Sequence, residues 1–118
     1  MSTPILIVSH THWDREWYRT FETFRARLVD AVDRVLDLLD ADPGWAFLLD
    51  GQAAVAEDYL AIRPHEHDRF EGHVRAGRLG IGPWYVQPDS LLPTGESHVR
   101  NLLEGRLVAE SLGGSSAV

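Results

Sequence analysis

Near its start the chain reads Ile5-Leu6-Ile7-Val8-Ser9-His10-Thr11-His12-Trp13-Asp14-Arg15-Glu16-Trp17-Tyr18. The first four residues of this segment are aliphatic, and a short run of this kind near the start of a chain predicts a buried strand over residues 5–8. Alternate side chains of an extended segment project from the same face. We therefore expect His10, His12 and Asp14 to point the same way where this strand ends.

Two imidazoles and one carboxylate at this spacing form a set of candidate metal ligands. Imidazole nitrogen and carboxylate oxygen are the usual ligands of a divalent ion such as zinc, although cobalt and manganese accept them as well. Trp13, Trp17 and Tyr18 lie in the same stretch, and flat aromatic rings suit the apolar face of a sugar. A polar loop without a function is the alternative. The combination of ligands and aromatic residues favours a metal or catalytic site.

Downstream of this segment, extended and helical patterns alternate along the chain. The expected elements are a helix capped by Thr20, a strand over 45–49, a helix over 53–60, a helix from Pro64 to Gly77, a strand over 79–82 and a helix over 96–112. Strands that alternate with helices predict an α/β fold with about three parallel strands and right-handed crossovers. Residues 1–112 are expected to form one unit, and residues 113–118 a flexible tail.

Apolar periodicity predicts which faces of the helices are buried. The first helix is expected to bury Phe24, Leu28, Val32, Val35, Leu36 and Leu39, and the apolar positions of the last helix are Val99, Leu102, Leu103, Leu107 and Val108. Because three strands cannot close a barrel, the apolar helix faces are expected to lack part of their cover. Between Pro64 and Gly77 the pattern is polar instead and includes three histidines. His65 and His67 are two residues apart in a predicted helix and so lie on different faces. This stretch is interpreted as solvated helix surface.

Polar loops follow all three expected strands. They are the quoted segment after Val8, Asp50-Gly51-Gln52, and Pro83-Trp84-Tyr85-Val86-Gln87-Pro88-Asp89. Because functional groups of parallel sheets gather at the carboxyl ends of the strands, the three loops are expected to share one pocket. Asp50 and Asp89 are candidate hydrogen-bond partners of sugar hydroxyls, and Trp84 is a candidate for the wall of the pocket. Core packing of Trp84 and a turn role for Asp89 after Pro88 are equally open.

Composition excludes several classes of partner. The net charge of −7 argues against nucleic acid and anionic membranes, which favour a basic surface. The sequence contains no apolar run long enough to span a bilayer and no pattern typical of a secretory signal. It also contains no cysteine, which excludes disulfides and thiolate metal sites. We expect a cytoplasmic protein that binds a small molecule. The oligomeric state stays open.

The run from Ile7 to Tyr18 resembles the opening signature of glycoside hydrolase family 38, the α-mannosidases. The resemblance continues in Leu49-Asp50-Gly51-Gln52, Gly77-Arg78-Leu79-Gly80-Ile81-Gly82-Pro83-Trp84-Tyr85-Val86-Gln87-Pro88-Asp89, Gly95-Glu96-Ser97 and Arg100-Asn101-Leu102-Leu103. It extends to about Leu112 and is strongest with the bacterial branch that includes mannosylglycerate hydrolases. It implies a distorted barrel of parallel strands and helices, of which this chain is the N-terminal part.

The resemblance also implies roles for individual residues. His12 and Asp14 match the family's first two zinc ligands, and Trp17 matches the aromatic residue that stacks on the sugar. His10 precedes the ligand pair and is a candidate to support it without contacting the ion. The implied reaction is hydrolysis of an α-mannosidic bond with retention of configuration, and the implied substrate is an α-mannoside or a mannosylglycerate-like small molecule.

The chain departs from the family pattern at the nucleophile. Retaining chemistry needs two carboxyl groups about 5 Å apart, and the family's nucleophilic Asp lies in a later segment that no stretch of this chain matches. The remaining zinc ligands, an Asp and a His, also lie further on. Two ligands fill half of a four-coordinate site, so one weakly held zinc ion is expected. The expectation is an N-terminal fragment that is inactive alone.

Two other classes of protein remain as alternatives. A non-catalytic sugar-binding or metal-binding module would keep the aromatic loops and the His/Asp pair and would need no nucleophile. A metal-dependent deacetylase-type or amidohydrolase-like barrel also places a His-x-His or His-x-Asp pair after its first strand. That barrel leaves the later motifs unexplained, and it ranks below the other two.

Overall fold

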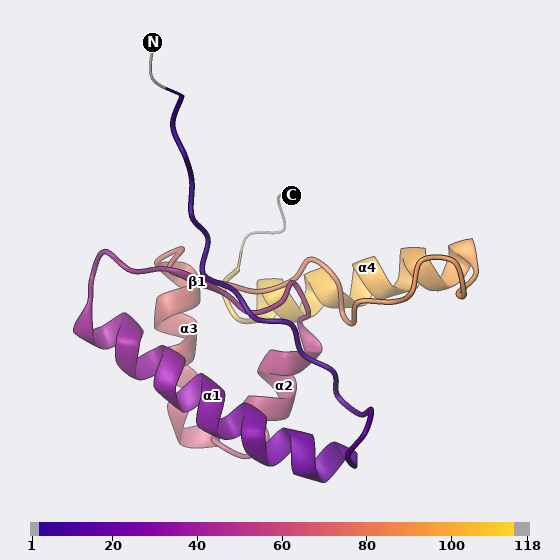
Figure 1. Cartoon of the computed structure of the whole chain (residues 1–118), viewed down its shortest axis with the longest axis horizontal. Coiled ribbons are helices and arrows are strands. Elements are labelled where there is room, and N and C mark those ends of the chain that lie inside the picture. The colour runs from indigo at the N-terminus through magenta and orange to yellow at the C-terminus, as the bar shows by residue number, and fades with distance from the viewer. Residues whose placement is uncertain (1–2, 115–118) are drawn as a thin grey trace.

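The computed structural model describes residues 3–114. The elements are α1 (Phe21–Ala41), β1 (Phe47–Leu48), α2 (Ala54–Leu60), the 3₁₀ helix η1 (Pro64–Glu66), α3 (His67–Arg75), β2 (Leu79–Gly80) and α4 (Gly95–Ser111). The long helix α1 lies across α2 and α3, and α4 extends to the side of this body (Figure 1). Within residues 3–114, every helix is too short or too polar to cross a bilayer.

The sheet is parallel, as an α/β fold requires, but it is small. Phe47 of β1 pairs with Leu79 of β2, and Leu48 pairs with Gly80. On the other edge of β1, the N–H of Leu48 donates to the carbonyl of Ser9 at 2.9 Å. A single parallel bridge then joins His10 to Leu48. The α/β class and the parallel pairing are confirmed, whereas the expected three-stranded part of a barrel is not.

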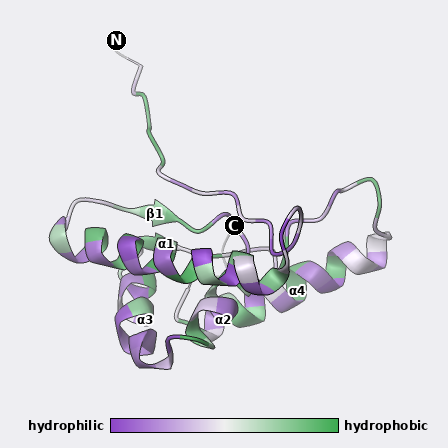
Figure 2. Cartoon of the chain, turned by 60° about the horizontal axis from the view of Figure 1, so that its bottom comes forward, coloured by the Kyte–Doolittle hydropathy of each residue, from purple (hydrophilic) through white to green (hydrophobic). Residues whose placement is uncertain are grey.

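The strand expected over residues 5–8 does not form. These four side chains are exposed, up to 90% for Ile7, and the segment leaves the body as an extended trace that is apolar along its length (Figure 2). The register of the bridge at His10 would pair Val8 with Ala46, which precedes the start of β1. A strand needs a paired edge and a buried face, and the described chain supplies neither at these residues.

Helix α1 confirms its predicted apolar face. All six predicted residues are buried, together with Val29. Its N-cap is Thr20, as expected, although the side chain makes no capping bond. The carbonyl of Thr20 instead accepts from the N–H groups of Thr23 and Phe24 at 3.0 and 3.1 Å. The buried face packs on α2 and α3, where Tyr59 and Phe70 stack with ring centroids 5.9 Å apart.

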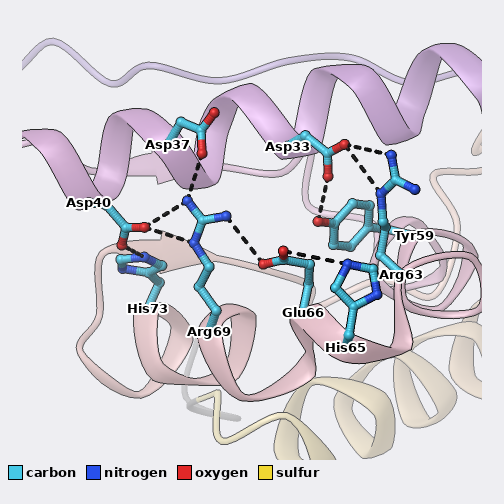
Figure 3. Close-up of polar contacts among 9 residues, drawn as sticks. All are labelled: Asp33, Asp37, Asp40, Tyr59, Arg63, His65, Glu66, Arg69 and His73. Carbon is cyan, nitrogen blue, oxygen red and sulfur yellow. Dashed lines mark hydrogen bonds and ion pairs between the residues drawn. The ribbon is translucent and has the colours of Figure 1, made fainter.

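A row of ion pairs joins the polar side of α1 to η1 and α3, and we call it the α1–α3 ion network (Figure 3). Its members are Asp33, Asp37, Asp40, Tyr59, Arg63, Glu66, Arg69 and His73. Arg69 donates to Asp37 at 2.8 Å and to Asp40 at 2.7 Å. The hydroxyl of Tyr59 donates to Asp33 at 2.8 Å. The network links α1 to the helices on which its buried face rests.

Helix α4 contacts the body through one narrow strip. Gly105, Val108 and Ala109 are its buried residues. Three residues of its predicted apolar face are exposed, namely Val99, Leu103 and Leu107. This apolar face lacks part of its cover, as expected, because α4 projects beyond the other helices and nothing within residues 3–114 covers that side (Figure 1).

The end of α4 is capped by glycine. The N–H of Gly113 donates to the carbonyl of Glu110 at 3.0 Å, and the N–H of Gly114 donates to that of Ala109 at 2.8 Å. Gly113 has a φ of 79°. This pair of bonds is a Schellman motif, which satisfies carbonyls at the end of the helix. Residues 115–118 of the predicted tail lie outside the described residues.

Gly105 sets the distance between α4 and the loop after β2. A Cβ at this position would lie 2.3 Å from the carbonyl oxygen of Pro83 and from the backbone nitrogen of Tyr85. We expect Gly105→Ala to lower the free energy of unfolding by about 1–3 kcal/mol, because backbone atoms have to move apart. Urea unfolding measures it.

The matched control is Gly72→Ala in α3, where an added Cβ meets nothing within 4 Å. This change is expected to raise stability by about 0.5–1 kcal/mol, because alanine favours a helix more than glycine does. Equal effects of the two substitutions would contradict the close approach at Gly105.

The α1–α3 ion network predicts a specific sensitivity to acid. Burial alone would raise the pKa of Asp33, but hydrogen bonds from Arg63 and Tyr59 outweigh it and hold that pKa below its usual value. The unfolded chain then binds protons more readily, so the stability from Asp33 is present at neutral pH and is lost as the pH falls below about 4. When the pH is lowered from neutral to below about 4, Asp33→Asn should lose less stability than the wild type. Urea unfolding at these two pH values measures the loss for each protein. Asp30→Asn, an exposed position of α1, is the control, and an identical acid response of all three proteins would refute the assignment.

Candidate metal centre

The three polar loops meet around one open cavity of about 450 Å³. Its lining comes from residues 12–16 of the first loop, from Gln52 of the second and from Val86 and Gln87 of the third, with Phe21 of α1 at the side. The expectation of a shared pocket is therefore confirmed. Residues that lie 35 or more positions apart in the sequence share this surface through a few side-chain hydrogen bonds.

Asp50 is the residue on which the first and second loops join. Its Oδ2 accepts from the N–H of Trp13 at 2.7 Å and from the Nε2 of Gln52. Its Oδ1 lies 3.1 Å from the Nδ1 of His12. Its side chain is almost inaccessible, with the residue 6% exposed. Both carboxylate oxygens are thus engaged inside the protein.

Gln52 extends this cluster to the third loop. Its Nε2 donates to the carbonyl of Trp13 at 2.7 Å, and its Oε1 accepts from the N–H of Gln87 at 3.0 Å. The side chain of Gln87 in turn donates to the carbonyl of Asp50. Asn101 of α4 holds the same loop from the other side, since it accepts from the N–H of Val86 at 2.9 Å and donates to its carbonyl at 2.6 Å.

The predicted ligand pair lies at the mouth of the cavity. The Nε2 of His12 is 3.6 Å from the Oδ1 of Asp14, and the two side chains are 63% and 46% exposed. Because a carboxylate can only accept, the contact with Asp50 assigns the proton of a neutral His12 to Nδ1. Nε2 then carries the free lone pair, 3.6 Å from Asp14. Two potential ligand atoms are therefore side by side and open to solvent.

Arg15 anchors the first loop to α2. Its guanidinium donates to both carboxylate oxygens of Asp58, at 2.7 and 2.8 Å, and lies over the ring of Phe21 at 4.8 Å. The hydrogen bond to Asp58 raises the pKa of Arg15 above its usual value despite the cost of burial. Asp50, Gln52 and Asp58 are the buried polar side chains of residues 3–114, and all three hold the loop that carries His12 and Asp14.

The other predicted site residues lie outside this cavity. Trp17 is 76% exposed and packs edge-on against Tyr18, with ring centroids 5.3 Å apart. Trp84 packs edge-on against His98 at 6.2 Å, and its backbone joins the second loop. Asp89 is exposed and accepts from the N–H of Leu91 at 3.1 Å, which is a turn contact. The ring of the exposed His10 contacts the carbonyl of Thr11. Of the predicted set, the structure brings together His12, Asp14 and Asp50.

The sequence did not single out Gln52, Arg15 and Asp58 as members of the site. For Gln52 a signal was present, because it belongs to the polar group directly after a strand. For Asp58 there was none, since a carboxylate in a short helix is normally exposed. Only the fold brings Asp58 to Arg15.

Another group of possible ligands lies on α3. One possible ligand atom from each of His67, Asp68 and Glu71 lies within 4.8 Å of the other two. His67 and Asp68 are exposed on the outer surface of the helix, where such clusters are common without a metal. We place more weight on His12 and Asp14, because buried hydrogen bonds hold their loop and because they line a cavity.

Comparison with known proteins identifies the family. The sequence profile described as "Glycosyl hydrolases family 38 N-terminal domain" matches residues 2–117. The chain belongs to glycosyl hydrolase family 38. It is 45% identical over 108 residues to a protein of Halalkalibacterium halodurans named "Putative mannosylglycerate hydrolase", covering 91% of this chain. The match covers 12% of that relative, so this family 38 chain spans a small part of the relative's length.

Two solved structures show the same fold. An alpha-mannosidase from Enterococcus faecalis V583 superposes with a TM-score of 0.87 at 46% identity, over 91% of this chain and 12% of the other. A glycosyl hydrolase family 38 protein from Enterococcus faecalis superposes with a TM-score of 0.83 at 42% identity, over 92% of this chain and 13% of the other. The predicted resemblance to family 38 is confirmed.

Proposed function

We propose that this chain contributes part of the zinc and sugar site of a retaining α-mannosidase. The observation that carries the proposal is the pair formed by His12 and Asp14, whose Nε2 and Oδ1 lie 3.6 Å apart at the edge of the shared cavity. Two ligand atoms that are each about 2.0–2.1 Å from one tetrahedral zinc ion lie roughly 3.3–3.4 Å apart. The separation and the types of the two donors therefore fit one zinc ion.

Family membership supports the reaction class. Glycosidase chemistry is the common property of family 38, and the relative from Halalkalibacterium halodurans bears the name of a mannosylglycerate hydrolase. We extend this to the present protein as hydrolysis of an α-mannoside, with a small mannosylglycerate-like molecule as substrate. The volume of about 450 Å³ is within the range of small-molecule sites.

His12 and Asp14 are proposed to hold the zinc ion, and Trp17 to stack on the sugar ring. When bound, the ion supplies contacts to sugar hydroxyls that help to distort the ring. Gln52 and Arg15 keep the loop of the two ligands in place. Trp84 and Asp89 remain candidates for contacts with more distant parts of the substrate.

None of the described carboxylates is proposed as the nucleophile. Asp14 is assigned to the metal, and both oxygens of Asp50 are occupied by other contacts. We propose that the nucleophile and two further ligands come from a part of the protein beyond these 118 residues, because the match covers 12% of a related protein.

The metal assignment is tested with Asp14→Ala. Zinc content and cleavage of an aryl α-mannoside are measured for the 118-residue chain and for a protein extended through the downstream coding sequence. In the extended protein we expect Asp14→Ala to lose zinc and turnover together, because one ligand of the ion is removed. Asp68→Ala, which removes a carboxylate of the group on α3, is expected to change neither.

Two results would contradict this assignment. Retention of zinc with full activity in Asp14→Ala would exclude Asp14 as a ligand, and loss of zinc in Asp68→Ala alone would move the ion to α3. Binding of zinc and mannoside by the extended protein without any turnover would favour the non-catalytic binding module instead.

The sugar contact is tested with Trp17→Ala and Trp17→Phe. Because the indole of Trp17 is exposed, its removal in the extended protein is expected to leave zinc content and the melting temperature unchanged. KM for the mannoside should rise about tenfold, the loss of one stacking contact. Trp17→Phe should recover most of this loss. Loss of zinc or of stability in Trp17→Ala would show instead that Trp17 supports the fold.

A further inference from the structure

We propose that Asp50 is a positioning residue that fixes His12 in its Nδ1–H tautomer and so offers Nε2 to the metal. This inference rests on the proposed function, since it concerns the same metal. It assigns to Asp50 a role different from the direct sugar contact predicted from the sequence. The reasons are the proton geometry at His12, the burial of Asp50 and the backbone conformation at that residue.

The proton geometry depends on what Asp50 can accept. Its Oδ1 lies 3.1 Å from the Nδ1 of His12. An ionised carboxylate has no proton to give, so Nδ1 carries the proton of the neutral ring. Nε2 is then left with a free lone pair 3.6 Å from Asp14. A metal-ligating histidine typically donates its other ring N–H to a carboxylate or carbonyl in this way.

Little else holds the ring of His12. Its side chain is 63% exposed, whereas that of Asp50 is 5% exposed. Packing therefore does not select one orientation of the imidazole. The contact with Asp50 is what orients the ring. Asp50 itself cannot turn away, because Trp13 and Gln52 both donate to its Oδ2.

The backbone at Asp50 is in the left-handed region, with φ 44°, and Gly51 follows with φ 67°. A residue with a side chain adopts this conformation at a cost, and glycine would avoid that cost. In the described residues Asp50 is the one non-glycine residue with positive φ. The strained backbone thus places the carboxylate of Asp50 where it makes its contacts with the first loop.

The substitution Asp50→Asn tests whether Asp50 sets the tautomer of His12. Trp13 and Gln52 donate to one oxygen of Asp50, and the backbone N–H of Trp13 cannot reverse. The amide of Gln52 is also fixed, since its oxygen accepts from Gln87. In the variant, the oxygen of the new side-chain amide would therefore take this side and leave its NH₂ facing His12. Nδ1 would then have to accept, and the proton would move to Nε2.

The experiment measures the tautomer of His12 by NMR in the metal-free 118-residue chain labelled with ¹⁵N-histidine, at neutral to mildly alkaline pH. We expect Nδ1–H in the wild type and Nε2–H in Asp50→Asn. Zinc is then titrated into both proteins and followed through the same signals. The variant should bind zinc about 10- to 100-fold more weakly, the usual loss when such a partner is removed.

The matched control is Asp58→Asn. Asp58 is about as buried as Asp50 and holds the same loop, but it does so through Arg15. This variant is expected to keep the Nδ1–H tautomer, because the hydrogen bonds of Asp58 go to Arg15 and not to His12. Asparagine also tolerates the left-handed region well, so the fold of Asp50→Asn should persist, and amide spectra check it.

Three results would overturn the proposal. They are Nε2–H in the wild type, an unchanged tautomer in Asp50→Asn, and the same tautomer change in Asp58→Asn. The wild-type result decides even if the variant fails to fold. If the 118-residue chain binds no zinc, the titration is repeated with the extended protein. Absence of zinc binding there would count against the proposed metal site, whereas the tautomer measurement would still decide the role of Asp50.

Discussion

The structure of this site depends on the buried carboxylate of Asp50. It receives the backbone N–H of Trp13, the side chain of Gln52 and the ring of His12, while the backbone carbonyl of Asp50 accepts from Gln87. Buried polar groups are costly unless their hydrogen bonds are made, and in residues 3–114 every buried side-chain nitrogen and oxygen has a partner. Removing one member of this cluster would leave the other members buried without a hydrogen-bond partner, at that cost. The three loops are therefore held in a single arrangement.

This cluster explains how so small a sheet can organise a cavity. Two strands of two residues each offer few backbone bonds to fix the loops that come after them. The additional restraint comes from side chains, with Gln52 linking the loops, Asn101 holding the third loop against α4 and Asp58 holding the first through Arg15. Behind them, the buried face of α1 and the α1–α3 ion network keep the helices in place. In this chain the loops are therefore supported more by the helices than by the sheet.

The parts that sequence predicts well are those governed by local pattern. The buried face of α1 follows from helical periodicity, and the convergence of three loops follows from the geometry of parallel strands. Residues 5–8 and the outer face of α4 have the right pattern, but burial there requires neighbouring chain, which residues 3–114 do not supply. Alternation predicts that His10, His12 and Asp14 lie together, and the structure brings together only the last two of them. Alternation also gives no indication that Asp50 engages both its oxygens inside the protein. Contacts between segments 35 or more residues apart have no local signature.

The proposed metal ion is shared by His12 and Asp14, and His12 would bind it through Nε2. Anomalous diffraction at the zinc edge from crystals of the zinc-soaked protein tests this most directly, since it locates the ion independently of activity. We expect one peak about 2.0–2.1 Å from both the Nε2 of His12 and an oxygen of Asp14, with the Nδ1 of His12 still hydrogen-bonded to Asp50. A peak on His67, Asp68 and Glu71 with none between His12 and Asp14, or an ion bound to the Nδ1 of His12, would contradict it.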